Sequence, residues 1–364
     1  MTNDELKLIW LRESFPWMGN HSGYELVCDL IPELQPGKYQ SVWKNSKPLS
    51  KITKRLLAPV TKKVKNSATY NETSAMQELK TLWNHLSSSW NLAHVVYLER
   101  TLGILPQWKQ RLSYKLFATA HQPAGLWRMR RHHPKMLSSL DGLIVLSSKE
   151  VAYFEQYIPN RVHFIPHGVD MDFFRPLTDK EKIIAQKPEP RCVFSGTWLR
   201  DLETLAQVID RVIAREPRIE FDMVVPIDKR GNPYFYRIAR HSQVKWHAGI
   251  SDEQLRDLYC QATMLVLPLL DCTANNALLE AMACGLPIVS NYVGGIPDYT
   301  RDSFADLLPV GDADGMVDTI IRLANNPQEC AQRGANARAF VEKNLTWEKI
   351  ATQTIEVYQK ILAK

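Results

Sequence analysis

The chain has 364 residues, 45% of them hydrophobic and 23% charged, which is ordinary for globular domains and enough for two of them. No run of about eighteen apolar residues predicts a membrane-spanning helix, and the acidic N-terminal stretch is unlike a secretory signal. The six cysteines show neither a CxxC pair nor zinc-ligand spacing, so we expect reduced thiols and a cytoplasmic protein.

The net charge of +6 is unevenly distributed along the chain. Residues 1–176 carry 23 Lys and Arg against 14 Asp and Glu, whereas the remainder carries 22 against 25. Two basic windows without acidic residues, 38–65 and 109–135, hold most of the excess. We expect them to meet an anionic membrane surface, peripherally on its inner face, with a solvated basic face or loop as the alternative. Nucleic acid is not an expected partner, because no recognised binding motif is present.

The first half of the chain predicts strands alternating with helices. Buried strands are predicted at 7–14, 91–99 and 114–123, within 140–150 and from residue 161. Gly19 and Gly23 flank a polar loop before a helix that begins near Tyr24, and His121 lies in the turn that ends one strand. In the first basic window, Pro59 is expected to interrupt any helix.

The pattern restarts near residue 191, which places the domain boundary within 166–176. Strands are predicted at 191–197, 220–226, 244–249 and 263–270, and helices at 201–216 and 252–262. This alternation predicts parallel sheets with right-handed crossovers. Ligands of such sheets bind at the carboxyl ends of the strands.

The segment 275–297, NNALLEAMACGLPIVSNYVGGIP, has the clearest functional pattern. Its asparagines suit the cap of a helix whose free N–H groups would favour a phosphate. Glu280, one turn further in, could accept hydrogen bonds from a ribose. Gly285 predicts the end of the helix, and Gly294-Gly295 predicts a close approach of another backbone. Neither a Walker A sequence nor GxGxxG is present, so P-loop NTPases and classical NAD sites lack their signatures.

This segment resembles the nucleotide-sugar site of family 4 glycosyltransferases of the GT-B fold. Segments at 140–150, 164–176, 244–270 and 345–362 resemble further parts of that family in the same order. The resemblance implies an α/β fold of two Rossmann-like parallel-sheet domains that face a central cleft. It assigns the acceptor to domain 1–170, with a C-terminal helix at about 350–364 packing back on it, and the donor to domain 171–349.

The implied activity is retaining, metal-independent transfer of a hexose-type sugar from a UDP- or GDP-sugar to an acceptor hydroxyl. We expect no cofactor beyond this co-substrate, and a lipid-linked or other anionic glycan as acceptor. The resemblance implies that His121 lies near the sugar, that Arg200 neutralises the diphosphate, and that Glu280 holds the ribose. The other donor-binding residues that it implies are Gly19, Gly23, Gly196, Thr197, Asp271, Cys272, Thr273, Asn275, Asn276 and Ala277.

One departure from the family pattern concerns its first glutamate, whose position is occupied by Cys272. Asp271 beside it could take over, or Thr273 and the backbone could hold the sugar. Two alternatives therefore stay open: a non-catalytic nucleotide-sugar or glycan-binding relative, and a nucleotide-sugar epimerase on the same fold. Arg200 could also be a surface charge that pairs with Asp201 or Glu203, and His121 a satisfied core histidine.

Two acidic motifs mimic metal sites but favour other roles. The Asp-Met-Asp sequence at 170–172 lies in the predicted linker, so no metal is expected there. The sequence at 311–315 lacks calcium-loop spacing and predicts a helix cap instead.

Overall fold

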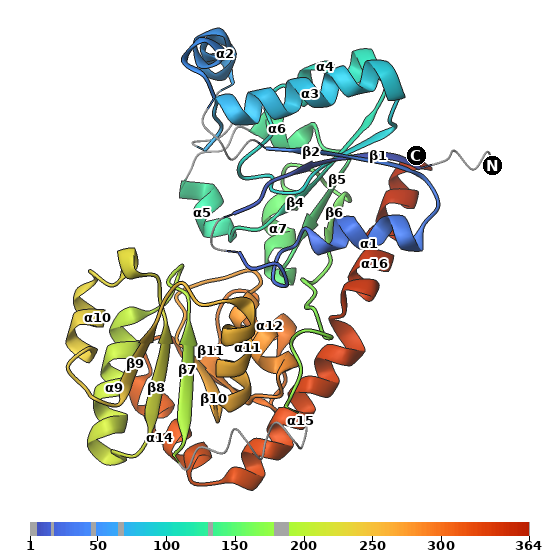
Figure 1. The fold of residues 1–364 in the computed structure, drawn as a ribbon. Coiled ribbons are helices and arrows are strands. Elements are labelled where there is room, and N and C mark those ends of the chain that lie inside the picture. The colour runs from blue at the N-terminus through green and yellow to red at the C-terminus, as the bar shows by residue number, and fades with distance from the viewer. Residues whose placement is uncertain are drawn as a thin grey trace. The chain divides into compact units, whose positions relative to one another are not determined.

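The computed structural model describes residues 6–15, 18–44, 49–64, 69–129, 134–177 and 189–363. They form two compact units (Figure 1). The first unit contains the residues up to Met18, residues Gly23–His167 and the residues from Trp347 onward, and the second contains Gly19–Ser22 and Gly168–Thr346. Each unit is built on one six-stranded sheet, as expected for a Rossmann-like GT-B architecture.

The first sheet is parallel throughout the described pairings. Its strands are β1 (Lys7–Arg12), β2 (Lys38–Trp43), β3 (Leu92–Val95), β4 (Lys115–Ala120), β5 (Gly142–Val145) and β6 (Val162–Phe164), in the order β2-β1-β3-β4-β5-β6. From β1, the chain adds β2 on one side of the sheet, and then adds β3 to β6 in order on the other side. The strand order therefore reverses between β1 and β3. Such a reversal opens a crevice at the carboxyl ends of the strands.

Helices cover both faces of this sheet (Figure 1). The helices of this unit are α1 (Leu26–Leu34), α2 (Lys51–Lys63), α3 (Glu72–Ser88), α4 (Leu105–Leu112), α5 (Ala124–Met129), α6 (Pro134–Ser138), α7 (Val151–Glu155) and α16 (Trp347–Leu362), of which α2 packs on α3. The C-terminal helix α16 packs against α1. A buried contact ties it to the sheet, because Nδ1 of His94 on β3 lies 2.5 Å from the hydroxyl of Tyr358 on α16.

Helix α2 corrects one prediction, since it runs through Pro59. A proline inside a helix removes one backbone hydrogen bond, but the remaining bonds of the 13-residue helix are retained. Ser50 caps the helix by accepting from the backbone N–H of Thr53 at 3.1 Å, and buried Leu57 faces inward where α2 packs on α3.

Strand β2 was missed, and several predicted strands are too long. The β2 segment has mostly polar, partly exposed residues because it forms the edge of its sheet, a position where lysine is common. The strand predicted at 91–99 ends at Val95, although Val96 and Leu98 are also buried. Buried apolar residues continue into the loop, so an apolar run in the sequence does not show where the strand ends.

The second sheet is also parallel in every described pairing of its strands. Its strands are β7 (Arg191–Ser195), β8 (Glu220–Val224), β9 (Val244–His247), β10 (Met264–Leu267), β11 (Ile288–Asn291) and β12 (Ala305–Leu308), in the order β12-β11-β10-β7-β8-β9. The strand order reverses between β7 and β10. The loops that follow these two strands are therefore the expected ligand site of this unit.

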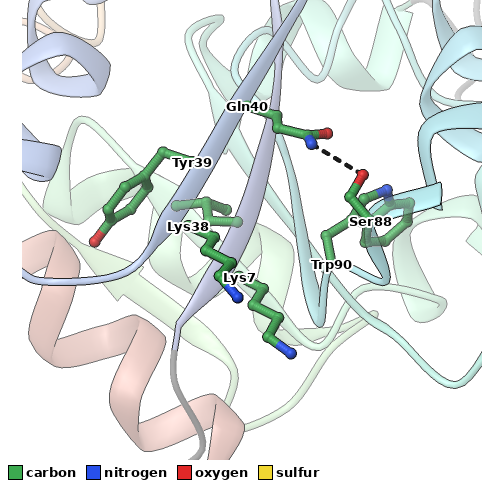
Figure 2. Close-up of a pocket in the computed structure, with 7 residues that line it drawn as sticks. Lys7, Lys38, Tyr39, Gln40, Ser88 and Trp90 are labelled. Atoms are coloured by element: carbon green, nitrogen blue, oxygen red, sulfur yellow. Dashed lines mark hydrogen bonds between the residues drawn. The ribbon is translucent and has the colours of Figure 1, made fainter.

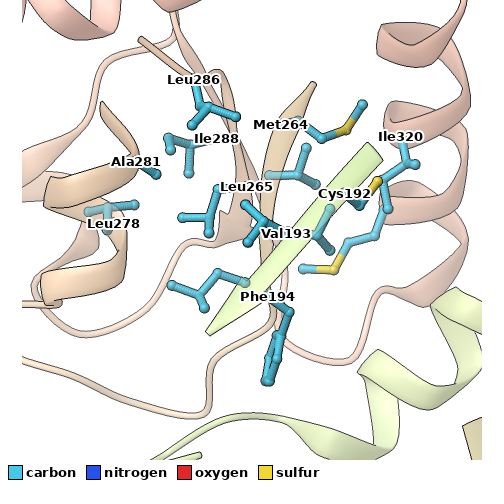
Figure 3. Close-up of a cluster of buried hydrophobic side chains, with 14 of the residues drawn as sticks. Cys192, Val193, Phe194, Met264, Leu265, Leu278, Ala281, Leu286, Ile288 and Ile320 are labelled. Carbon is cyan, nitrogen blue, oxygen red and sulfur yellow. The ribbon is translucent and has the colours of Figure 1, made fainter. Parts of the chain in front are cut away.

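The helices of the second unit enclose a continuous hydrophobic core. They are α9 (Leu202–Arg215), α10 (Pro233–Ile238), α11 (Asp252–Gln261), α12 (Asn276–Ala283), α13 (Ile296–Tyr299), α14 (Ala313–Ala324) and α15 (Pro327–Asn344). Figure 3 shows Val193 and Leu265 of the central strands between Leu278 of α12 and Ile320 of α14. A central strand buried on both faces explains why these segments read as nearly continuous apolar runs.

Among the described residues, none of the helices combines the length and the hydropathy that crossing a bilayer requires.

Candidate functional site

The loop after β7 is folded around the guanidinium group of Arg200. Its Nε and Nη2 donate to the carbonyl oxygen of Ser195 at 3.1 and 2.9 Å, and its Nη1 donates to that of Trp198 at 3.1 Å. Gly196 has a φ of +83°, and a Cβ there would lie 3.0 Å from Nη2 of Arg200. Glycine is therefore required in this turn both for its backbone conformation and for the space that it leaves.

Arg200 is half-buried, and its described partners are backbone carbonyls rather than a carboxylate. Asp201 instead caps α9, accepting from the backbone N–H and the hydroxyl of Thr204 at 3.1 and 2.7 Å. The alternative that Arg200 pairs with Asp201 or Glu203 thus has no support from these contacts. Burial lowers the pKa of Arg200 to about 10, so the side chain is still a cation at neutral pH.

The start of helix α12 follows the loop after β10. Asn275 is its N-cap and accepts from the backbone N–H of Leu278 at 3.3 Å, as predicted. The side-chain amide of Asn276 donates to the carbonyl oxygen of Ser22 at 2.6 Å. The first N–H groups of a helix have no acceptor inside it, so the segment that includes Ala277 presents donors at the carboxyl end of β10.

Glu280 is buried, with only 4% of its surface exposed, so it is not a solvated residue on the outer face of its helix. The hydroxyl of Tyr259 on α11 donates to its Oε2 at 3.0 Å, and the Ser22 side chain also hydrogen-bonds to it. Burial raises the pKa of Glu280, while the bonds from Ser22 and Tyr259 lower it and the charge of Asp252 raises it. Among the described residues, the two groups that lower its pKa, Ser22 and Tyr259, are neutral donors.

Cys272, at the position of the family's first glutamate, is a buried free thiol. Its backbone N–H donates to Oδ1 of Asp271 at 2.8 Å, and its carbonyl accepts from the N–H of Gly295 at 2.9 Å. Gly294 has a φ of +53°, and a Cβ there would collide with the Cys272 carbonyl. The predicted close approach at Gly294-Gly295 is confirmed, and the backbone that approaches is that of Cys272. The adjacent Thr273 is buried.

The polar loop near the N-terminus divides between the units. Gly19–Ser22 is counted with the second unit, where the N–H of Asn20 donates to Oδ2 of Asp252 at 2.7 Å. A Cβ on Gly19 would lie 2.6 Å from Cγ of the same aspartate. Gly23 belongs to the first unit, and the group that an added Cβ there would meet first is the flexible side chain of Met18. Close packing therefore requires a glycine at position 19 more than at position 23.

His121 follows β4 in the first unit, and its Nε2 lies 2.8 Å from the carbonyl oxygen of Val96. Burial, followed by the charge of His167, lowers the pKa of His121 to about 3. The imidazole is therefore neutral at physiological pH. Because only an N–H can donate to a carbonyl, Nε2 carries the ring proton. Rings of Tyr24 and Tyr97 pack around it, with centroids 5.0 and 4.4 Å away.

The predicted site residues fall into two groups. Gly19, Gly196, Thr197, Arg200, Asp271–Thr273, Asn275–Ala277 and Glu280 lie in the second unit, whereas Gly23 and His121 lie in the first. Sequence reasoning missed Tyr259 and Ser22, the two hydroxyl donors to Glu280. Neither carries a recognisable signal, because a buried tyrosine on a helix is ordinarily part of the core.

The two acidic motifs have local explanations. Asp170 lies 2.7 Å from Nδ1 of His21 and accepts from the backbone N–H groups of Asp172 and Phe173. Asp312 is the N-cap of α14 and accepts from the N–H of Gly315 at 2.9 Å, which confirms the predicted cap.

A pocket of about 280 Å³ lies in the first unit (Figure 2). It lies at the beginnings of β1 and β2, where Lys7 and Lys38 line it together with Trp90. Because the sheet is parallel, His121, which follows β4, lies at the other end of the strands, where their carboxyl ends are. Within the first unit, the pocket is therefore separate from His121.

Comparison with known proteins assigns residues 189–326 to the family described as glycosyl transferases group 1. An MMP alpha-(1->4)-mannosyltransferase from Mycolicibacterium hassiacum is 26% identical over 65% of this chain and 56% of its own length. A GDP-mannose-dependent monoacylated alpha-(1-6)-phosphatidylinositol monomannoside mannosyltransferase from Corynebacterium glutamicum is 23% identical over 69% of this chain and 71% of its own. The chain spans little more than half the length of several curated relatives that it matches.

Solved structures confirm the fold over nearly the whole chain. A sucrose-phosphate synthase from Thermosynechococcus elongatus superposes with a TM-score of 0.73 at 19% sequence identity, covering 98% of this chain and 99% of that one. At this identity the likeness establishes a shared architecture and leaves the substrates to the residues of the site.

Proposed function

We propose that the chain is a GT4-like glycosyltransferase of the GT-B fold, which moves a hexose-type sugar from a nucleotide sugar to an acceptor hydroxyl with retention of configuration. The second unit would bind the donor and the first the acceptor. The observation that carries the proposal is the gathering of Arg200, the start of α12 and Glu280 around the loops after β7 and β10.

The donor diphosphate would lie against Arg200 and the first N–H groups of α12. Negative charge grows on the diphosphate as the bond to the sugar breaks, and preorganised donors stabilise that charge. Arg200 is already held by three hydrogen bonds to backbone carbonyls, so little reorganisation is needed. Glu280, one turn after the start of α12, would accept hydrogen bonds from the ribose hydroxyls.

In the transfer step, the acceptor oxygen bonds to the anomeric carbon while the bond from that carbon to the diphosphate breaks. The acceptor proton passes to the departing phosphate oxygen on the same face of the sugar, which accounts for retention without a metal ion. His121 would contact the sugar as a neutral imidazole, in keeping with its lowered pKa of about 3. Its role is binding or polarisation; because Nε2–H donates to the carbonyl of Val96, contact with a sugar hydroxyl would use Nδ1 as the acceptor.

The sugar itself is addressed by an unusual set of groups. Cys272 cannot supply the carboxylate that the family places there, so either Asp271 takes over this role or Thr273 and the backbone hold the sugar. The donor is proposed to be a UDP- or GDP-sugar, the second being the donor that the corynebacterial relative's name states.

The acceptor is proposed to be a lipid-linked or other anionic glycan at the inner face of a membrane. Helix α2 supports this proposal, because Ile52 and Leu56 are 74% and 73% exposed among the cations Lys51, Lys54 and Arg55. Exposed apolar residues beside cations suit an anionic lipid surface.

The basic windows contribute unequally to this surface. Lys44 is buried and pairs with Glu13 at 3.3 Å, and Lys109 pairs with Asp141 at 2.7 Å. Residues 45–48, 65–68 and 130–133, which include several of the counted cations, lie outside the described part of the chain. The described helix α2 is therefore the part of the windows on which the proposal rests.

The test of the donor site is stabilisation of the purified protein by UDP, GDP, ADP and CDP and by their sugar conjugates, without added metal. A ligand at a hundred times its Kd should add about 2.7 kcal/mol to the free energy of unfolding. We expect one base to stabilise the protein, and Glu280→Gln, which keeps the shape of the side chain, to abolish that effect. The absence of stabilisation by every nucleotide would overturn the proposed donor site.

The same preparation separates the alternatives. Transfer of labelled sugar to a lipid-linked acceptor supports the proposed enzyme. Conversion of the nucleotide sugar without acceptor would identify an epimerase. Nucleotide binding with neither hydrolysis nor transfer would identify a binding relative in which Cys272 marks a lost activity.

A further inference from the structure

Two side chains from neighbouring helices of the second unit share a buried hydrogen bond. The Tyr259 hydroxyl on α11 donates to Oε2 of Glu280 on α12 at 3.0 Å, with 0% of the tyrosine and 4% of the glutamate exposed. A buried carboxylate is unfavourable unless donors replace its lost water. Tyr259 supplies one such donor from within the hydrophobic core.

The second donor to Glu280, Ser22, is less firmly fixed by its surroundings than Tyr259 is. Ser22 lies in the short segment Gly19–Ser22, whereas Tyr259 is part of a regular helix and packs near Phe174, with ring centroids 6.4 Å apart. A ligand whose hydroxyls donate to Glu280 could replace Ser22, but Tyr259 is held by the core. It therefore determines which way the carboxylate faces.

Tyr259 also connects Glu280 to the arginine of the site. The Ser195 side chain, at the end of β7, hydrogen-bonds to the Tyr259 hydroxyl. The carbonyl oxygen of the same serine accepts both Nε and Nη2 of Arg200. Ser195 thus contacts both residues, Arg200 through its backbone carbonyl and Tyr259 through its side chain, and Tyr259 in turn donates to Glu280.

We propose that Tyr259 is a positioning residue that orients the Glu280 carboxylate toward the nucleotide ribose and keeps it in register with Arg200. This inference rests on the proposed function, because it assigns a partner to the proposed ribose-binding group. Tyr259 touches no substrate in this arrangement and acts only through Glu280.

The test is the variant Tyr259→Phe, which removes one hydroxyl and leaves the ring in place. We expect the Kd of the preferred nucleoside diphosphate and the KM of its sugar conjugate to rise about tenfold, with kcat changed less than threefold. The matched control is Tyr114→Phe, which removes the hydroxyl of another buried tyrosine, one that donates to the carbonyl of Leu105 in the first unit. The control should lose comparable stability and keep its nucleotide affinity.

A pH profile distinguishes positioning from a general loss of structure. Glu280 is faced by Tyr259 and Asp252 from α11, by Ser22, and by Cys284 one turn along its own helix. Removing the Tyr259 bond removes one of the contacts that lower the Glu280 pKa. The acidic loss of nucleotide affinity should therefore move to higher pH in Tyr259→Phe and stay unchanged in Tyr114→Phe.

The outcomes distinguish the positioning role of Tyr259 from the proposed function on which it rests. Failure of the unchanged protein to bind any nucleotide overturns the proposed function, and the positioning role with it. Binding that depends on Glu280 but is identical in Tyr259→Phe, at every pH, overturns the positioning role alone.

Discussion

The backbone of Cys272 passes so close to Gly294 that no Cβ could be accommodated between them. A Cβ on Gly294 would lie 2.7 Å from the Cys272 backbone nitrogen, and the Gly294 φ is +53°. The residue at the unusual position of the site is therefore held by a glycine 22 positions further along the chain. This relationship defines the shape of the loop that would address the donor sugar.

Gly294→Ala should consequently destabilise the protein. We expect a loss of about 1–3 kcal/mol, because the substitution combines a left-handed backbone with a collision against backbone atoms. Urea unfolding followed by tryptophan fluorescence measures the change. Gly249→Ala is the control, since Gly249 has a similar φ of +62° but no atom within 4 Å of an added Cβ. An equal loss in both variants would show that the contact with Cys272 contributes nothing.

Arg200→Gln should lower kcat/KM for the nucleotide sugar by about 10²–10³, the effect of removing one donor aimed at developing charge. Steady-state kinetics at saturating acceptor would measure it. Arg211→Gln, on the exposed face of α9 where Arg211 pairs with Asp314, is the control and should retain activity. Full activity in Arg200→Gln at unchanged stability would remove Arg200 from the site.

Stability should fall in acid because of His94. This side chain is fully buried, with Nδ1 near the Tyr358 hydroxyl and Nε2 at 2.9 Å from that of Thr119. Burial, followed by the charge of His121, lowers the pKa of His94 to about 3 from 6.5. The unfolded chain then binds the proton more readily than the folded one, so stability present above pH 6.5 is lost progressively as the pH falls toward 3.

The variant His94→Gln tests this linkage, because an amide keeps polar contacts without titrating. Its unfolding free energy should depend less steeply on pH between about 6.5 and 4 than that of the unchanged protein. Identical slopes for the two proteins in that range would contradict the assignment to His94.

Helix α2 should attach the protein to anionic vesicles. We expect binding to vesicles that contain phosphatidylglycerol, weaker binding to neutral phosphatidylcholine vesicles, and a decrease with added salt. Ile52→Gln combined with Leu56→Gln should weaken the binding about tenfold or more, because two exposed apolar side chains no longer enter the interface. Sedimentation with vesicles measures it, and Ile227→Gln, an equally exposed isoleucine in the second unit, is the control. Undiminished binding by the double variant would exclude α2 as the contact.

The local features of the proposed donor site were accessible from the sequence. Asn275 as a cap and the strand at 191–197 follow from hydrogen-bonding chemistry and hydrophobic periodicity, which act over a few residues. The family resemblance added the roles proposed for Arg200 and Glu280. The helix through Pro59 and the edge strand β2 were predicted wrongly or missed, because local propensity opposed what packing and pairing stabilise.

Sequence alone therefore determined the alternation of strands and helices, the restart of the pattern in the second half and the residues that carry charge or a cap. Only the tertiary structure decided that Tyr259 donates to Glu280 and that Gly294 closes on Cys272. These partners lie about twenty residues apart in the chain and on different elements. Their contact depends on which helix faces and which loops the packed sheet brings together, and a one-dimensional pattern does not encode that geometry.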